Sequence, residues 1–348
     1  MARKGVVFVT FNYRVGALGF LAHPALSAES PNHVSGNYGI LDQIAALQWV
    51  KRNIAAFGGD AANVTIAGES AGSCSVNTLI ASPPAKGLFR RAIAESAAFF
   101  KPGRNLTLRE GEEDGVRFMR GKNALTLEAM RALSPDSLLK GDYRRLPVVD
   151  GYLLPDHIDE LFKKGAINKV DLITGYNEGD NFVEDSMSAA QFVAFAQRNY
   201  GPRADSFLVL YPAGSWSSQQ ALGRDLHFAW EHYTWAKEEG ARAYMYYFDR
   251  VPPGEPRLGA FQSAEVCYAL HTLAFQNRPW TRWDSTLSNL MSDYWVNFAF
   301  TGDPNGNGLP PWPVFSPEKT RVIRFGDTVE AIDLPALRAF GFFQPYPR

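Results

Sequence analysis

The sequence predicts an α/β fold, in which a mostly parallel central sheet is flanked by helices. Short apolar runs alternate along the chain with longer amphipathic segments of helical period. Strands that are separated by helices form parallel sheets covered on both faces. The chain has 348 residues, of which 46% are apolar, so it can bury a large core. Because no internal repeat or low-complexity linker divides it, we expect one domain over residues 1–348.

The individual elements follow from the spacing of apolar residues. Near-continuous apolar runs, typical of buried parallel strands, occupy residues 6–11, 63–67, 89–94, 170–174 and 243–248. Segments with an apolar residue every three or four positions are expected to be helices. They cover residues 41–57, 70–80, 125–139, 189–200 and 222–239.

Composition excludes several classes of function. The formal net charge is −1 and the Lys and Arg residues form no run, so no nucleic-acid partner is expected. No stretch approaches the roughly 18 apolar residues of a membrane span. Cys74 and Cys267 are too few for a disulfide framework and are expected to be buried. We expect no cofactor and no metal, while oligomeric state and location, cytoplasmic or secreted, stay open.

Residues 68–72 read Gly-Glu-Ser-Ala-Gly, between an expected strand and an expected helix. In this context Gly-x-Ser-x-Gly places a serine on a sharp turn that lifts its Oγ clear of the sheet. The glycines let neighbouring backbone pass without Cβ clashes. The N–H of Ala71, at the helix start, then points toward a developing oxyanion. Ser70 is therefore the candidate nucleophile; the alternative is a structural turn serine.

Several longer motifs occur in a fixed order around this turn. They are Thr10–Phe20 (TFNYRVGALGF), Asn37–Gln43 (NYGILDQ), Phe57–Asp60 (FGGD), Tyr294–Ala299 (YWVNFA) and Thr301–Gly306 (TGDPNG). With the Ser70 turn, they make the chain resemble the type-B carboxylesterase (cholinesterase-like) family, from about residue 6 to residue 315. The resemblance implies the α/β-hydrolase fold. It also implies hydrolysis of a small-molecule carboxylic ester through an acyl-serine and a Ser–Glu/Asp–His triad.

The segment that resembles the family's acid loop holds two carboxylates. In Gly175-Tyr176-Asn177-Glu178-Gly179-Asp180, ungapped spacing from Asn177 places Asp180 at the catalytic position. Matching the family's Glu-Gly dipeptide would instead select Glu178, at the expense of a two-residue deletion. We favour Asp180; a third possibility is that both are solvated loop residues.

The segment Leu258–Val266 (LGAFQSAEV) resembles the family's histidine loop, but Gln262 stands at the histidine position. Glutamine can occupy that space and contact Ser70, yet it cannot accept a proton as a general base. His227 and His232 lie on an aromatic-rich expected helix and serve either in a substrate pocket or in packing. His271, nine residues after Gln262 and on the expected next helix, lies too far along to replace the base.

Two further features concern the rest of the expected site. Glu69, beside the nucleophile, is a candidate substrate-binding residue; the alternative is a buried glutamate paired with an arginine such as Arg14. The family's His-Gly-Gly-Gly oxyanion stretch and its preceding strand do not occur before residues 6–11. We therefore expect a fold that lacks the family's N-terminal strands, and Met1 to be an internal start. Of the expected oxyanion donors only Ala71 remains.

The residues thus favour an ester hydrolase by descent with impaired activity. Two alternatives stay open. One is a non-catalytic, cholinesterase-like binding protein, and the other is a truncated or pseudogene product.

Overall fold

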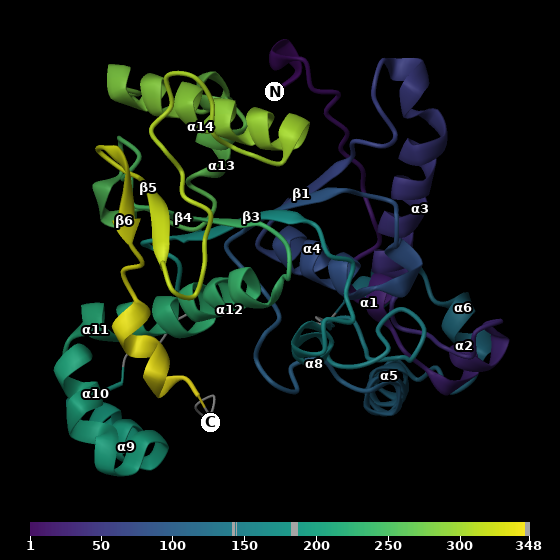
Figure 1. Ribbon diagram of the computed structural model, residues 1–348. Helices are drawn as coiled ribbons and strands as arrows, with labels where there is room; N and C mark the ends of the chain where they lie inside the picture. The colour runs from purple at the N-terminus through teal and green to yellow at the C-terminus, as the bar shows by residue number, and fades with distance from the viewer. Residues whose placement is uncertain (141–142, 144, 182–186, 345–348) are drawn as a thin grey trace.

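A computed structural model describes residues 1–140, 143, 145–181 and 187–344 (Figure 1). Within these residues six strands are present: β1 (Thr65–Glu69), β2 (Arg91–Glu95), β3 (Asp171–Asn177), β4 (Ala243–Phe248), β5 (Arg321–Phe325) and β6 (Val329–Asp333). The helices of the first half are α1 (Gly16–Phe20), α2 (Pro24–Glu29), α3 (Tyr38–Asn53), α4 (Ala71–Ala81), α5 (Leu108–Gly121), α6 (Leu127–Ala132), α7 (Pro135–Leu139) and α8 (Ile158–Lys163). Those of the second half are α9 (Ala189–Tyr200), α10 (Ala204–Leu210), α11 (Trp216–Arg224), α12 (Trp230–Glu238), α13 (Val266–Ala269) and α14 (Arg282–Thr301).

The strands form one sheet in the order β1-β2-β3-β4-β5-β6. The pairs from β1 to β5 are parallel, and only β6 runs antiparallel, against β5. This mostly parallel sheet confirms the predicted fold class. Since parallel strands end at the same edge, residues that follow β1, β2 and β3 meet at one end of the sheet.

Side chains that alternate along the strands enter two separate cores, as the period of two requires. Ala92, Leu172 and Met245 face a cluster that includes residues of α4, α8 and α12. Their neighbours Ile93, Ile173 and Tyr244 face a second cluster with residues of α13 and α14. Helices thus cover both faces of the sheet (Figure 1). Cys74 and Cys267 are free and buried, one in each cluster, as predicted.

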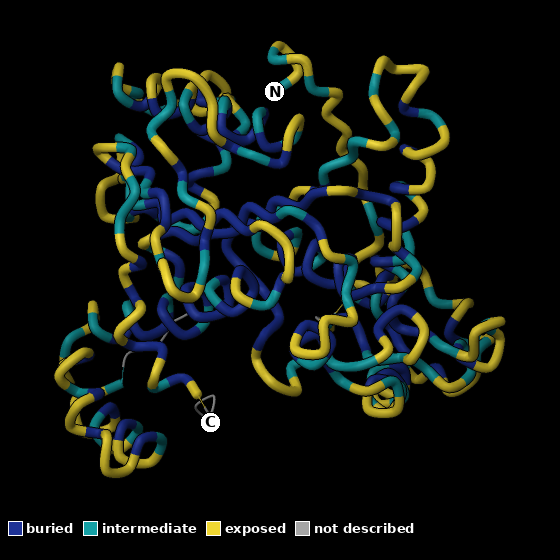
Figure 2. The backbone as a smooth tube through the Cα atoms, viewed as in Figure 1, coloured by how far each residue is buried: buried dark blue, intermediate teal, exposed yellow. Residues whose placement is uncertain are grey.

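The predicted strand at residues 6–11 is wrong. These residues have no regular secondary structure, and Val7, Phe8, Val9 and Phe11 are each 40–49% exposed (Figure 2). A strand needs a neighbour to pair its backbone groups. Within the described residues β1 pairs only with β2, so its other edge is free of strands.

Smaller differences concern the helices and the far edge of the sheet. The helix expected over residues 125–139 is two short helices, α6 and α7. The helix expected over residues 222–239 includes a π-helical turn at Asp225–Ala229, between α11 and α12. The charged strands β5 and β6 were not predicted. Among the described helices, none combines the length and the apolar character that crossing a bilayer requires.

Candidate active site

Ser70 lies on a sharp turn between β1 and α4. Its backbone has φ 54° and ψ −115°, a conformation that is costly for a residue with a side chain. The turn is held by its surroundings, because the Ser70 N–H donates to Glu95 O at 2.8 Å and Cys74 N–H donates to Ser70 O at 3.0 Å. A Cβ on Gly68 would lie 2.3 Å from the carbonyl carbon of Gly72. Glycine at position 68 is therefore a steric requirement of the turn.

Gln262 contacts the serine hydroxyl directly. Its amide nitrogen Nε2 lies 2.8 Å from Ser70 Oγ and donates to it. The two residues are 192 positions apart in the chain, and the parallel sheet brings their loops to the same end. The amide offers a hydrogen to Oγ and, unlike an imidazole, takes up no proton at biological pH.

Asp180 lies fully buried on the loop after β3. Its Oδ2 accepts the Asn177 N–H at 2.7 Å, whereas Oδ1 is buried with no hydrogen-bond partner among the described residues. Burial, and next the neighbouring carboxyl of Glu265, raise the pKa of Asp180 well above its usual range. A buried carboxylate with an unused acceptor is costly unless a donor meets it.

Glu178 points into different surroundings. Its Oε1 forms an ion pair with Arg224 at 2.5 Å, and its Oε2 accepts the Tyr247 hydroxyl. The Glu178 side chain is 47% exposed, in contrast to the buried Asp180. Both of its oxygens are thus engaged on the side of α11 and β4.

The acid loop and the glutamine loop are joined by the backbone and by one amide side chain. Gly179 N–H donates to Ala260 O at 3.0 Å, within a bridge between Gly179 and Phe261. Asn177 Nδ2 donates to Phe261 O at 2.9 Å and to the carboxylate of Glu265. Sequence reasoning gave no role to Asn177 or Glu265. The sequence does hold a signal for Asn177, because a polar residue at the end of a buried apolar strand needs hydrogen-bond partners.

Buried acids surround this junction. Glu95 and Glu265 are both buried, and burial raises the pKa of each, that of Glu265 to about 7. Glu95 accepts the Trp295 indole N–H at 2.9 Å, while Glu265 lies 3.4 Å from the hydroxyls of Ser96 and Tyr246. No histidine or arginine side chain is in an ion pair with these two acids within the described part of the chain. Burial thus favours the neutral, protonated form of both carboxyl groups.

Glu69 lies half-buried next to Ser70. It accepts the Ser263 hydroxyl at 3.0 Å, and burial raises its pKa. The alternative pairing with Arg14 is wrong, since Arg14 instead forms a two-pronged pair with Asp42. Glu69 thus links the Ser70 turn to Ser263, the residue that follows Gln262.

The histidines lie elsewhere. His232 is fully buried, with Nδ1 2.5 Å from Thr174 Oγ1, and burial lowers its pKa to about 3. Burial likewise lowers the pKa of His227 to about 4. His271 is not helical as predicted: α13 ends at Ala269, and His271 has a φ of 57°. None of these rings forms a hydrogen bond with Ser70 in the described residues.

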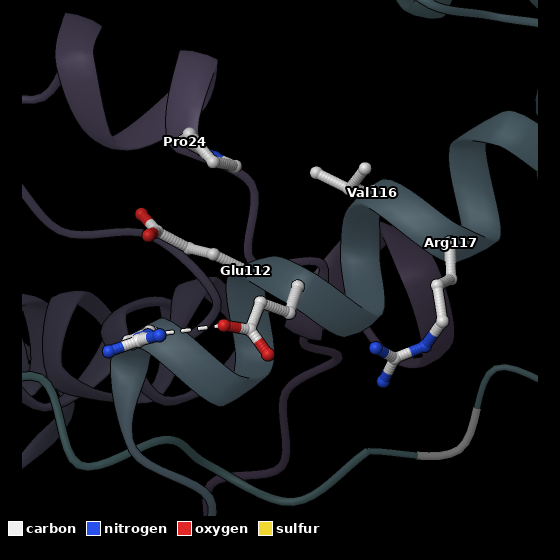
Figure 3. Close-up of a pocket in the computed structure, with 6 residues that line it drawn as sticks. Pro24, Glu112, Val116 and Arg117 are labelled. Atoms are coloured by element: carbon white, nitrogen blue, oxygen red, sulfur yellow. Dashed lines mark hydrogen bonds and ion pairs between the residues drawn. The ribbon is translucent and has the colours of Figure 1, made fainter.

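Ala71 is the first residue of α4 and is exposed. The first N–H groups of a helix have no acceptor within it, and no backbone acceptor for the Ala71 N–H is present among the described residues. A hollow of about 450 Å³ lies elsewhere, between Pro24 and α5 (Figure 3). Its charged side chains balance one another, and Arg109 pairs with Glu113 at 3.1 Å.

Comparisons with known proteins agree with this geometry. The model of the carboxylesterase family matches residues 1–206 and 212–339. The fumonisin B1 esterase of Sphingopyxis macrogoltabida is 34% identical over 94% of this chain, and the para-nitrobenzyl esterase of Bacillus subtilis (strain 168) is 34% identical over 92%. The chain spans only 65% and 69% of these two relatives.

A solved PNB esterase superposes with a TM-score of 0.81, at 29% identity, over 95% of this chain and 72% of the esterase. The sheet order, the serine turn and the family match lead to one assignment. This chain belongs to the carboxylesterase family and has its α/β-hydrolase fold.

Proposed function

We propose that the chain is a carboxylic ester hydrolase in which Ser70 is the nucleophile and Gln262 replaces the base, so that turnover is severely slowed. One observation carries the proposal: the Gln262 amide donates to Ser70 Oγ at 2.8 Å, where a proton acceptor is needed. The substrate class, a small-molecule carboxylic ester, follows from the family. The members named above are esterases.

The missing step is proton transfer. When Ser70 Oγ attacks the ester carbonyl carbon, it must lose its proton, and the leaving alkoxide must later gain one. A histidine performs both transfers, since its pKa lies near neutrality. The Gln262 amide takes up no proton, so both transfers fall to water. In a serine hydrolase, loss of the histidine alone costs about 10⁶-fold in turnover.

We assign Asp180, and not Glu178, as the acid of this site. The unpaired Oδ1 of Asp180 supports the choice, because a histidine at position 262 would have a ring N–H to place there. Glu178 is committed to Arg224 and Tyr247. A buried acid in a catalytic triad orients the histidine and stabilises its imidazolium form. With glutamine at position 262, Asp180 has no imidazolium to stabilise.

Ala71 and Glu69 complete the proposed site. The free N–H of Ala71 supplies one donor for the oxyanion, and each such donor contributes about 10²- to 10³-fold in rate. We assign Glu69, the last residue of β1 and half-buried beside Ser70, to contact with the alcohol or acyl group of a bound ester. Its carboxyl favours a substrate that is neutral or cationic near the ester.

The test is to restore the base. Gln262→His should raise kcat on a short-chain nitrophenyl ester by about 10³-fold or more. It should also speed labelling of Ser70 by a phosphonate, followed by mass spectrometry. Ser70→Ala/Gln262→His is the control and should show neither effect. If Gln262→His is folded but shows no increase in kcat or in the labelling rate, a base at position 262 does not act on Ser70 as proposed.

A second candidate function is ester binding without turnover, which Gln262 also favours. It predicts saturable binding of a hydrophobic ester with no product over hours, unchanged in Ser70→Ala. Slow but Ser70-dependent product formation by the natural chain would decide for the hydrolase instead.

A further inference from the structure

A second hollow lies at the opposite end of the sheet from Ser70. It has a volume of about 800 Å³ and is formed by the segments that enter β1, β2 and β3, together with the end of α3. Residues such as Val64, Arg90 and Val170 line it, and each directly precedes a strand. Val64 and Ser70 are separated by the whole of β1, which at about 3.3 Å per residue amounts to about 20 Å. This hollow, here called the basic groove, is therefore distinct from the candidate active site.

The charges in the basic groove have one sign. Its thirteen lining residues include four cations and no carboxylate. The cations are Lys51, Lys86, Arg90 and Lys169. None of the four is in an ion pair with a residue that the structure describes. Four like charges around one hollow repel one another and produce a positive potential that an anion relieves.

The neighbouring acids are already engaged. Asp60 accepts the Ala62 N–H at 2.8 Å, and Asp171 pairs with Arg242 at 2.8 Å. Glu239 accepts the Val170 N–H at 3.1 Å and the Trp235 indole at 2.9 Å. None of these three acids forms an ion pair with a cation of the groove within the described residues.

The floor of the groove is apolar. Leu88, Phe89 and Val170 belong to the core cluster and are each 7–9% exposed, while Val64 and Ile167 pack against it. The floor is also held in place. Asn168 donates from its backbone to Ile80 O at 2.8 Å and from its side chain to Leu79 O and Ser82 O at 3.2 and 2.8 Å. Lys51 Nζ donates to Gly87 O at 2.9 Å, which fixes one cation at the rim.

We propose that the basic groove binds an amphiphilic anion, in which an alkyl or aryl chain carries a carboxylate or phosphate. The cationic rim would take the headgroup and the apolar floor would take the chain. A volume of about 800 Å³ is within the range of small-molecule sites, roughly 300–1,000 Å³. It is small for a nucleic-acid strand, and the net charge of the chain is −1.

Decyl phosphate, below its critical micelle concentration, is the probe, and calorimetry gives stoichiometry and affinity. We expect one saturable site whose affinity falls with added NaCl, as for partly exposed charges. From hexyl to decyl phosphate the affinity should rise about two- to fourfold per methylene group, as burial of the chain requires. Decanoate in parallel shows whether the carboxylate or the phosphate is the preferred headgroup.

A pair of variants locates the site. Lys86→Glu/Lys169→Glu should weaken decyl phosphate binding at least tenfold. Arg257→Glu/Lys319→Glu makes the same charge change on exposed residues outside the groove and should leave the affinity unchanged. Thermal unfolding should show that both variants are folded.

Several results would overturn the proposal. One is equal affinity in the groove variant and the natural chain, and another is inorganic phosphate binding as tightly as decyl phosphate. Binding to phosphatidylglycerol vesicles without binding of monomeric decyl phosphate would indicate a membrane surface instead. Since the salt and chain-length series use the natural chain, the proposal stays testable even if the variants fail to fold.

Discussion

Asp180 and Glu178 stand two residues apart on one loop, yet their side chains meet opposite surroundings. Asp180 is buried, and its Oδ1 has no hydrogen-bond partner among the described residues, whereas Glu178 forms an ion pair with Arg224. Starting from Gln262→His, we expect Asp180→Asn to remove most of the gained activity, up to about 10⁴-fold, because an amide cannot hold the histidine in its working tautomer. Glu178→Gln in the same background should change kcat less than tenfold. Steady-state kinetics on the nitrophenyl ester separates the two, and the reverse order would make Glu178 the acid.

The two glycines of the serine turn differ in the space around them, although the motif treats them alike. A Cβ on Gly68 would overlap the backbone of Gly72, whereas one on Gly72 would meet nothing within 4 Å. Gly68→Ala should therefore lower the free energy of unfolding by about 2–4 kcal/mol, as for other substitutions that force backbone to move. Gly72→Ala, in the first turn of α4, should be neutral or stabilise by up to about 1 kcal/mol. Urea unfolding of both variants measures the difference; equal losses would mean that the turn has no such steric limit.

At the scale of elements, the segment Val6–Phe11 is the part of the chain whose sequence and structure disagree most. It has six consecutive residues of high β-propensity with no charge, and four of its apolar side chains are 40–49% exposed. Exposed segments of this composition pair with other chains and promote aggregation. Val9→Lys should therefore reduce aggregation, seen as a smaller rise of light scattering with concentration. It should change the unfolding free energy by no more than about 0.5 kcal/mol, since Val9 is 41% exposed.

Val314→Lys is the matched control, because Val314 is 48% exposed but lies outside the apolar segment. It should leave scattering unchanged. A clear loss of stability in Val9→Lys would instead mean that the segment is packed against the fold.

The elements that could be predicted from the sequence are those whose own residues indicate how deeply they are buried. The strands β2, β3 and β4 are buried on both faces, so their apolar runs identify them, and residues 63–67 lie within two positions of β1. The run at residues 6–11 has a similar composition but no partner strand among the described residues, because pairing is not encoded in a single segment. The strand β6 is the edge of the sheet and is partly exposed, while β5 is paired on both sides but carries Arg321 and Arg324. Neither strand therefore has the near-continuous apolar run that identifies the others.

The residues of the candidate site also differ in how far the sequence predicts them. Ser70 and Gln262 could be placed from motifs, because each lies in a turn whose sequence is distinctive. The choice between Asp180 and Glu178, and the positions of Asn177 and Glu265, depend on contacts between loops that are far apart in the chain. Those contacts exist only once the parallel sheet has aligned its strand ends.

At the scale of the whole molecule, the helices that cover the sheet bury several ionisable groups, and these make stability depend on pH. Burial raises the pKa of Glu231 and Glu239 to about 8, so the folded state binds protons that the unfolded state releases above about pH 4.5. Their contribution to stability is therefore lost as the pH rises toward 8. His232, which lies on α12 and contacts Thr174 of β3, has the opposite effect on the pH dependence of stability.

The folded-state pKa of His232 is about 3, whereas an unfolded histidine titrates near 6.5. Below about pH 6.5 the unfolded chain takes up a proton that the folded chain refuses, so stability falls by about 1.4 kcal/mol per pH unit down to about pH 3. His232→Gln removes this proton uptake. The stability lost through His232→Gln should therefore be largest at pH 7.5 and shrink steadily between pH 6.5 and 4.5. Because Glu231 and Glu239 are present in both chains, their opposite trend cancels in the difference. Urea unfolding at pH 7.5, 6.5, 5.5 and 4.5 measures it, with His33→Gln, at an exposed position, as the control. A difference that stays constant over this range would mean that the His232 ring takes up its proton without leaving its place beside Thr174.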